Sequence, residues 1–448
     1  MKHSMTQAFG FFLTAGLFFS ALPAVGDGYE ILGHSQLGTG FAYAGAVSGY
    51  GDGSSAHSNP AAMSQIDRTT FNFGLHIVPI QNEFKDGGSQ VVGLPNAGTN
   101  GGESIRPHPL VDLYAVHPAS DDLTLGFALT TPFGLSTKYA EDHFVRYQGQ
   151  FAELATYKLG PSVAYDVNSK LSIGAGVSAI YSDAKFDSVV DFGTIGFGLL
   201  GPATATALGL APQGNDGKVS ISADDWSLGW RVGALWRFDE DGHNRIGLNY
   251  RGKTSVDLDG DANYTVPTSA AALNATGAFA DGNASSGLTY PEQIVLGGSH
   301  RIDDQWNFLW ESAWTRWSRF NELRIAFDAP GQADSVTTEN WRNTWRHAVG
   351  VSYQPNTDWI LRTGFSFLRG TITQSQFTTP AIPLGNTYIL GAGGSYKFDE
   401  DLSLHFGYVH EFIEDQSINR TSPTGDQLLG EFENYVGIIS ASVVYKLS

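Results

Sequence analysis

The feature that most constrains this chain is a repeated segment of roughly 10 residues in which apolar and polar side chains alternate. A β-strand that crosses an apolar membrane core about 25 Å thick at a tilt of about 40° needs roughly 10 residues. The period of two therefore predicts strands, and the length predicts that they cross a membrane. There are fourteen such segments: 69–78, 109–118, 123–139, 153–167, 170–186, 218–238, 243–264, 288–303, 305–320, 341–355, 358–370, 386–398, 402–418 and 431–447.

The links between these segments alternate strictly between short and long. The short links are the polar turns 119–122, 166–169, 239–244, 303–304, 355–357 and 399–401. The long links are 79–108, 140–152, 187–217, 265–287, 321–340, 371–385 and 419–430. Tight periplasmic turns and long external loops are typical of barrels in the bacterial outer membrane. The sequence thus predicts an all-β fold, a 14-stranded antiparallel transmembrane β-barrel over residues 69–448.

The composition agrees with this fold and excludes other classes. After residue 26 no run of 18 apolar residues occurs, so the sequence offers no helical membrane span. The 54 glycines and 28 phenylalanines are typical of membrane barrels. A net charge of −19 argues against nucleic acid as a partner, because such binding relies on Lys and Arg. The absence of cysteine suits an exported protein.

Residues 1–26 are predicted to be a signal peptide. Lys2 and His3 give a weakly positive start, residues 9–22 are apolar, and 24–26 (AVG) offer the small residues that a signal peptidase reads. Cleavage after Gly26 would remove one lysine and no acidic residue, so the net charge of −19 would become −20.

The alternation also assigns side chains to the lipid or to the lumen. In the last strand Tyr435, Ile439 and Val443 share the parity of the lipid face. A midplane arginine that faces lipid costs about 2–4 kcal/mol, so charged residues on the opposite parity are assigned to the lumen. These residues are Arg231, Arg237, Arg251, Glu311, Arg346 and Arg362.

Residues 27–68 precede the first strand and are rich in Gly, Ala and Ser. A barrel of this size encloses a lumen too wide for side chains alone to fill. The segment is therefore predicted to be a plug, or hatch, inside the lumen. The alternative is a disordered periplasmic tail.

A kink is predicted in the third strand, at Pro132, Phe133 and Gly134. Proline removes a hydrogen-bond donor from the ladder and glycine weakens a strand, so a bulge or bend is expected. The alternative is that the strand ends early.

The long link 187–217 is more apolar than expected for an external loop that is exposed to water and binds nothing. It is predicted to pack on the similarly apolar 266–280 and to form a hydrophobic groove; the alternative is that both loops only cap the barrel. The groove residues are Phe192, Ile195, Phe197, Leu199 and Leu200.

Four stretches occur in a fixed order: 38–45 (GTGFAYAG) with Asn59, Pro60 and Ala61, then 133–139 (FGLSTKY), 288–292 (LTYPE) and 314–320 (WTRWSRF). In this order they resemble the long-chain fatty-acid transporter (FadL) family of outer-membrane channels, over essentially the whole mature chain. The resemblance implies a monomeric barrel closed by an N-terminal hatch, in which Asn59, Pro60 and Ala61 have a gating role.

The same resemblance implies a groove among the external loops, a pocket inside the barrel and lateral exit through the kinked third strand. The implied function is outer-membrane transport of hydrophobic small molecules, above all long-chain fatty acids. The implied partners are this ligand, outer-membrane lipid and lipopolysaccharide, with no cofactor and no metal.

The sequence departs from the family at the positions that bind the ligand's carboxylate, where it has Ser188 and about Thr337. Lys185, Arg342 and Arg346 are close in sequence and are the predicted substitutes. The departure gives weight to an uncharged ligand such as an aromatic hydrocarbon.

Two other functional classes are alternatives: an enzyme and a general diffusion porin. An enzyme would need a motif such as G-x-S-x-G or H-E-x-x-H, and the sequence has neither. His405 and His410 lie on opposite faces of one strand, so they cannot share a metal. A general diffusion porin would need an open lumen, which the predicted plug argues against. The sequence therefore favours a channel for hydrophobic molecules.

Overall fold

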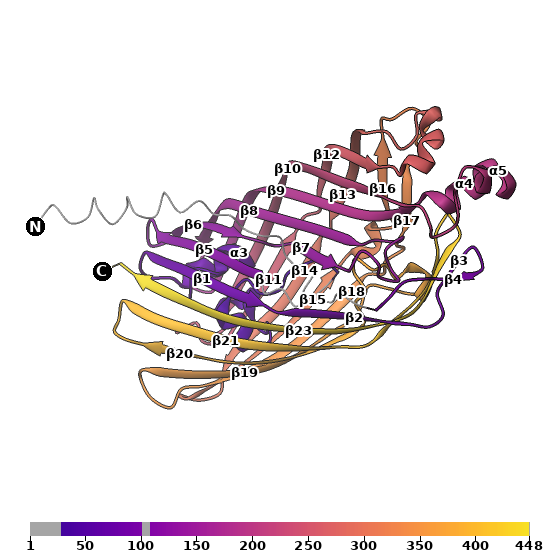
Figure 1. Ribbon diagram of the computed structural model, residues 1–448. Helices are drawn as coiled ribbons and strands as arrows, with labels where there is room; N and C mark the ends of the chain where they lie inside the picture. The colour runs from indigo at the N-terminus through magenta and orange to yellow at the C-terminus, as the bar shows by residue number, and fades with distance from the viewer. Residues whose placement is uncertain (1–27, 101–107, 448) are drawn as a thin grey trace, which may run out of the picture.

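The computed structural model describes residues 28–100 and 108–447. The predicted signal peptide, residues 1–26, lies outside them. Within the described residues fourteen antiparallel strands close into a barrel, because β1 (Thr70–Val78) pairs with both β5 (His108–Pro118) and β23 (Asp426–Lys446). The prediction of a 14-stranded barrel is confirmed (Figure 1).

Several barrel strands consist of two consecutive segments, separated by a proline, a glycine or a short irregular stretch. The remaining strand segments are β2 (Ile80–Asp86), β3 (Gln90–Val91), β4 (Leu94–Pro95), β6 (Leu123–Thr130), β7 (Gly134–Lys138), β8 (Phe151–Asp166), β9 (Leu171–Asp191), β10 (Asp216–Arg237), β11 (Arg245–Arg251), β12 (Thr254–Thr265), β13 (Gly282–Tyr290), β14 (Gln293–Arg301), β15 (Trp306–Thr315), β16 (Glu322–Phe327), β17 (Ser335–Thr338), β18 (Thr344–Tyr353), β19 (Trp359–Leu368), β20 (Thr387–Lys397), β21 (Leu402–Ile413) and β22 (Gln416–Thr421).

The helical segments lie before the first strand and in the long links. Those before β1 are α2 (Gln36–Gly40), η1 (Ala46–Ser48), α3 (Ser55–Ser58) and η2 (Pro60–Gln65). Those in the long links are α4 (Phe192–Leu200), α5 (Pro202–Ala207), η3 (Thr268–Thr276), η4 (Trp317–Arg319) and η5 (Ser375–Phe377). Among the described residues no helix is both long enough and apolar enough to cross a membrane.

The six predicted short turns are confirmed, and they lie at the end of the barrel where the C-terminus lies (Figure 1). The predicted long link 419–430 is wrong. β22 and β23 continue as a hairpin, and only residues 422–425 separate them. The prediction used apolar alternation, which marks only the part of a strand that faces lipid. Beyond the membrane the outward row of apolar side chains ends, and in this hairpin the apolar residues Ile418, Leu428 and Phe432 are buried instead.

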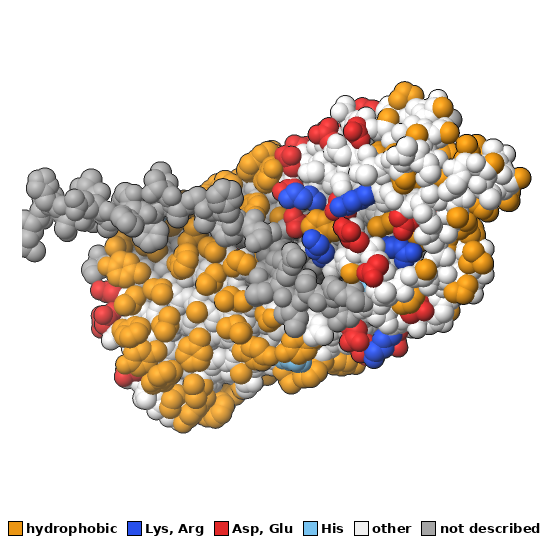
Figure 2. Space-filling model, in the orientation of Figure 1, with side chains coloured by type: hydrophobic (Ala, Val, Ile, Leu, Met, Phe, Trp, Pro, Cys, Tyr) orange, Lys and Arg blue, Asp and Glu red, His pale blue; other side chains and the backbone are white. Residues whose placement is uncertain are grey.

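The barrel wall is apolar outside and largely polar inside. In β1 the outward side chains Phe71, Phe73, Leu75 and Ile77 are exposed, whereas inward residues such as His76 are buried. Figure 2 shows a broad field of hydrophobic side chains over the half of the barrel near the chain ends, and charged side chains on the other half. This inverted pattern is what a barrel surrounded by lipid requires.

Residues 29–66, which we call the hatch, pack against the inner face of the barrel and are nearly all buried. Inward-facing glycines allow the close approach. A Cβ atom at Gly364 would lie 2.0 Å from the carbonyl oxygen of Phe41, and one at Gly247 would lie 2.1 Å from that of Val47. Larger residues at these two positions would push the hatch backbone away from the wall.

The six charged residues assigned to the lumen all contact the hatch. Arg231, Arg237 and Arg346 donate hydrogen bonds to His57, Ser64 and Tyr43, and Arg251 forms an ion pair with Glu30. Glu311 accepts from the backbone N–H of Val47, and the guanidinium of Arg362 lies 5.5 Å from the ring of Phe41. The parity rule therefore found the charges that hold the hatch.

Candidate binding cavities and the break in the barrel wall

The third barrel strand is broken between β6 and β7, at Thr131 to Phe133. On one side the break is a bulge: Thr130 pairs with Lys158 and Gly134 with Ala155, which leaves one extra residue on the β6–β7 side. On the other side β6 pairs with β5 as far as Leu129, and β7 has no partner in β5 among the described residues. We call this opening the wall break.

The start of the hatch takes over the pairing at the wall break. The N–H of Ile31 donates to the carbonyl of Pro132 at 2.9 Å, and the N–H of Gly134 donates to the carbonyl of Tyr29 at 2.9 Å. Glu30 and Phe133 form an antiparallel bridge. The wall at this point is thus completed by a segment far away in sequence, held by few backbone bonds.

A cluster of aromatic side chains surrounds the inner side of the wall break. Phe133 stacks on Tyr290 with 4.2 Å between ring centroids, and Tyr29 meets Trp317 edge-on at 4.6 Å. The cluster also contains Phe320 and Trp341. Next to it, Glu292 forms ion pairs with Arg316 and Arg319, which flank Trp317 in sequence. We call Tyr29, Phe133, Tyr290, Trp317, Phe320 and Trp341 the aromatic cluster.

An apolar cavity with about 920 Å³ of empty space lies against the aromatic cluster, inside the barrel towards the long-loop end. Inward-facing residues of several strands line it, together with residues of the long links. They include Leu154, Ala223, Leu258, Leu288, Phe320 and Ile382. Its almost wholly apolar lining suits a hydrophobic small molecule.

Three acidic or basic side chains line the apolar cavity: Glu153, Lys185 and Glu339. Lys185 lies 3.3 Å from Glu153 and 3.4 Å from Asp183, so its charge is already compensated. Glu339 is buried and accepts a hydrogen bond of 3.0 Å from the indole N–H of Trp341. Burial raises the pKa of Glu339 from 4.5 to about 8, with Arg420 opposing the shift. At neutral pH this carboxyl group is therefore uncharged.

We expect ligand affinity to fall above pH 8 because of Glu339. The folded protein holds this proton more tightly than the unfolded chain, so the proton's stabilising contribution is largest at low pH and is lost as pH rises towards 8. Ionisation of Glu339 places a negative charge beside the apolar cavity. The fraction of protein molecules in which Glu339 is uncharged falls about tenfold by about pH 9, and affinity falls with it. Equilibrium binding of an uncharged fatty methyl ester should show this loss in the parent protein. Glu339→Gln should remove it, Glu400→Gln in an exposed turn should not, and a pH dependence that survives in Glu339→Gln would contradict the assignment.

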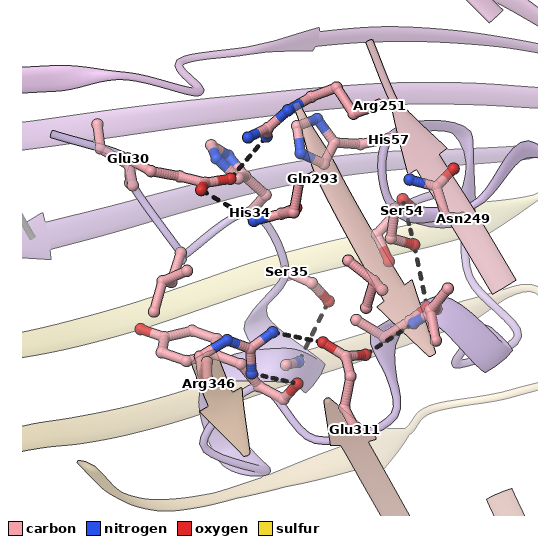
Figure 3. Close-up of a pocket in the computed structure, with 18 of the residues that line it drawn as sticks. Glu30, His34, Ser35, Ser54, His57, Asn249, Arg251, Gln293, Glu311 and Arg346 are labelled. Atoms are coloured by element: carbon pink, nitrogen blue, oxygen red, sulfur yellow. Dashed lines mark hydrogen bonds and ion pairs between the residues drawn. The ribbon is translucent and has the colours of Figure 1, made fainter. Parts of the chain in front are cut away.

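A second cavity, with about 810 Å³ of empty space, lies between the hatch and the wall (Figure 3). It is polar and contains two ion pairs, Arg251–Glu30 at 2.6 Å and Arg346–Glu311 at 2.5 Å. Gln293 donates to the second oxygen of Glu30 at 2.9 Å. We call this space the hatch cavity. Arg251–Glu30 connects a barrel strand to the hatch. Glu311 and Arg346 both lie on barrel strands and contact the hatch through hydrogen bonds with Val47 and Tyr43.

Asn59, Pro60 and Ala61 are buried in the hatch. The side-chain oxygen of Asn59 accepts from the N–H of Ala61 at 3.1 Å, which caps η2, and its amide nitrogen donates to the carbonyls of Val47 and Ala234. Pro60 occupies the first turn of η2, where its missing N–H costs nothing. These contacts hold the hatch to β10; a gating role remains a prediction.

The predicted groove residues lie in a compact external cluster. Phe192 is fully buried and packs with Leu210 and Leu273, and Ile195, Phe197 and Leu200 lie against this cluster. The predicted packing of 187–217 on 266–280 is thus observed. None of the five predicted residues lines the apolar cavity, and Leu199 is 69% exposed on the outer surface.

The structure does not bring the three predicted head-group residues together. Lys185 lines the apolar cavity, whereas Arg346 lines the hatch cavity and is paired with Glu311. Arg342 donates from Nε to the carbonyl of Gly370 at 2.8 Å. A head group cannot reach all three side chains in this arrangement.

Sequence reasoning missed Lys158, Glu339 and Tyr29 as site residues. Lys158 had a usable signal, because it has the buried parity of its strand, shared with Thr156 and Ser162. Glu339 and Tyr29 lie in irregular segments, in which apolar and polar residues do not alternate. Only closure of the barrel brings them to the cavity.

Comparison with known proteins gives one family and several relatives. The family model described as outer membrane protein transport protein (OMPP1/FadL/TodX) matches residues 17–447. The chain is 30% identical over 404 residues to the long-chain fatty acid transport protein of Escherichia coli O6:H1, with 86% of each chain covered. It is 26% identical over 421 residues to outer membrane protein P1 of Haemophilus influenzae, with 89% of this chain and 88% of the relative covered.

Two solved structures share the fold. A FadL homologue of Pseudomonas aeruginosa superimposes with a TM-score of 0.85 at 22% identity, over 94% of this chain and 100% of that one. The toluene transporter TodX of P. putida superimposes with a TM-score of 0.68 at 18% identity, over 95% and 99%.

Proposed function

The chain belongs to the outer membrane protein transport protein (OMPP1/FadL/TodX) family, and from this premise we propose that it takes up long-chain fatty acids. Transport of hydrophobic compounds across the outer membrane is the common activity of the family. The proposal adds the cargo and a route: capture at the external loops, binding in the apolar cavity, and exit sideways through the wall break.

The observation that carries the proposal is the position of the apolar cavity. It lies inside the barrel against the aromatic cluster, and the aromatic cluster contains Phe133 of the wall break. A hydrophobic molecule in the lumen thus lies next to the wall break, where β5 and the third strand separate. Lateral exit at that point would spare it a passage through periplasmic water.

Capture at the loops is supported by the outer surface of α4 and α5. Leu199 and Leu208 are exposed there, and Phe192 anchors the helices on a buried cluster. Exposed leucines on a well-anchored element offer an apolar surface to an approaching amphiphile. We keep the predicted groove, with Phe192, Ile195, Phe197, Leu199 and Leu200, as part of this proposal.

The second candidate cargo is an uncharged aromatic hydrocarbon. It is favoured by Lys185, whose charge is offset by Glu153 and Asp183, and by the neutral state of Glu339. Under either cargo we propose that the protein acts as a monomer among lipid and lipopolysaccharide, without a cofactor. The filled lumen argues against a general diffusion porin.

Filling the apolar cavity should abolish binding. Ala223 lines it from β10, so Ala223→Phe places a ring in the space that the ligand needs. We expect at least about a tenfold loss of affinity for a labelled long-chain fatty acid, since each 1.4 kcal/mol of lost contact is a factor of ten. Ala234→Phe is the matched control, because Ala234 has the outward parity of Val232 and Trp236 on the same strand. Unchanged binding in a folded Ala223→Phe protein would remove this cavity from the route.

A further inference from the structure

Three cationic side chains meet at one point of the hatch cavity. Arg231 and Arg251 are direct register partners on β10 and β11, and both point inward. Lys158 enters from β8 and lines the same cavity. Like charges directly opposite one another on a sheet are unfavourable, so this arrangement calls for compensating negative charge.

The carboxylates that line the hatch cavity are too few to compensate these cations. Glu30 pairs with Arg251 at 2.6 Å, while Glu311 is committed to Arg346. Among the described residues that line the hatch cavity, the cationic side chains are Lys158, Arg231, Arg251 and Arg346, and the carboxylates are Glu30 and Glu311 only. Asp112, behind the cavity, is held by His34 and His76. An excess of positive charge therefore remains.

Several of the donors have no acceptor. Arg231 is 5% exposed; its Nη1 donates to the carbonyl of His57, and its Nη2 has no hydrogen-bond partner in the described structure. The same is true of Nε and Nη2 of Arg251. Lys158 meets only the ring nitrogen Nδ1 of His57, at 2.9 Å. Buried donors are almost always satisfied, so these atoms point to a ligand that accepts hydrogen bonds.

The imidazole of His57 also experiences the positive charge of these side chains. The pKa of His57 is lowered well below its ordinary value, first by burial and then by Lys158, His34 and Arg231. His57 therefore stays neutral and does not add to the charge. It leaves Lys158 with a neutral partner rather than a carboxylate.

Apolar surface adjoins these cations. A smaller space of about 380 Å³ is lined by Lys158, Arg231 and Arg251 at one side and by Phe133, Ile180 and Tyr290 at the other. The guanidinium of Arg251 lies 5.1 Å from the ring of Phe133. Ile180 and Tyr290 belong to the same hydrophobic cluster as the lining of the apolar cavity. The space thus offers cations for a head and apolar walls for the first part of a chain.

We propose that Lys158, Arg231 and Arg251 bind the carboxylate of the transported molecule, beside the wall break. The proposal rests on the proposed function, because it requires an acid with a hydrophobic tail as cargo. Each arginine offers fixed donors for a carboxylate oxygen, and such charge-assisted bonds are the strong ones. The site differs from the one that sequence proximity suggested, since it contains neither Lys185 nor Arg342.

The test compares hexadecanoate with hexadecanol, which has the same chain without a charge, on the purified full-length protein in a non-ionic detergent at neutral pH. The parent should bind the acid more tightly. Arg231→Gln and Arg251→Gln should each weaken binding of the acid by about ten- to a hundred-fold and leave the alcohol unchanged. Arg362→Gln is the matched control, because it removes a luminal arginine that faces Phe41 on another side of the hatch.

Equal affinity of the parent for acid and alcohol would contradict the proposed carboxylate site but not the uptake of hydrophobic molecules. An acid preference that survives in the Arg231→Gln, Arg251→Gln double variant places the head group elsewhere and overturns the assignment. An equal loss in Arg362→Gln marks a general charge effect and also overturns it. Binding of neither compound by a folded parent contradicts the proposed function itself. Heat-modifiable migration on a gel establishes that each variant is folded.

Discussion

Replacing Pro132, Phe133 and Gly134 by Val, Thr and Val is expected to abolish fatty-acid uptake while the barrel remains folded. The three new residues favour a regular strand, and valine restores the ladder donor that Pro132 lacks. β6 and β7 would then form one strand, and the opening beside β5 would close. Uptake by whole cells should fall to the background of cells without the protein, since cargo in the lumen would have no lateral exit.

Pro161→Val is the matched control for this variant. Pro161 also lies within a barrel strand, β8, but it pairs with Phe127 away from the wall break. Its replacement should leave uptake unchanged. Normal uptake by the correctly folded triple variant would contradict the lateral route.

A reversible version of the same experiment uses the absence of cysteine from the chain. Glu30 and Phe133 are bridge partners, and the Cα atoms of such pairs are close enough for a disulfide. Glu30→Cys together with Phe133→Cys should lock the hatch onto the wall break when oxidised. Uptake should be blocked by oxidation and restored by reductant. No difference between the two redox states would mean that the start of the hatch need not move.

Glu311→Ala is expected to loosen the hatch and to make the barrel leaky. Glu311 is buried, accepts from Arg346, and also accepts from the N–H of Val47 at 3.0 Å. Its loss leaves Arg346 as an uncompensated buried charge, which typically costs about 3–5 kcal/mol. The strand pairings that close the barrel do not involve this contact, so the cost falls on the attachment of the hatch. Single-channel conductance should rise, and cells should become sensitive to large hydrophilic antibiotics.

The double variant Glu311→Met with Arg346→Met separates charge from packing. It removes both members of the buried pair and keeps side chains of similar length, a change that is often tolerated. It should conduct far less than Glu311→Ala. Equal leakage in both variants would mean that the lost hydrogen bond to Val47, and not the uncompensated charge of Arg346, loosens the hatch. A tight Glu311→Ala protein would show that this ion pair is dispensable.

The fold was predictable because side chains of a membrane-spanning strand alternate between lipid and lumen, and this alternation is visible within the sequence of a single strand. In the last strand the exposed side chains Tyr435, Ile439 and Val443 share one parity, so they mark both the strand and its orientation. The same rule fails outside the membrane. The end of β22 and the start of β13 have no lipid-facing side chains to reveal them, and the sequence predicts the links 419–430 and 265–287 there.

The cationic site was less predictable than the fold. Alternation along a strand shows which side chains face the lumen, but it does not show which residues of neighbouring strands lie opposite each other. Alternation placed Arg231 and Arg251 in the lumen, but only the pairing of β10 with β11 places them opposite each other. Lys158 reaches the same point from another strand. Closeness in sequence predicts Lys185, Arg342 and Arg346 as head-group residues, but the closed barrel places Lys185 and Arg346 in different cavities.

The most direct test of the account is uptake of radiolabelled long-chain fatty acid by an Escherichia coli strain that lacks its own long-chain fatty acid transport protein. The account predicts that cells expressing this protein take up the fatty acid well above the vector control, and that Ala234→Phe matches the parent while Ala223→Phe falls to the control. Uptake at the level of the vector control, by cells whose outer membrane contains the folded parent protein, would contradict it.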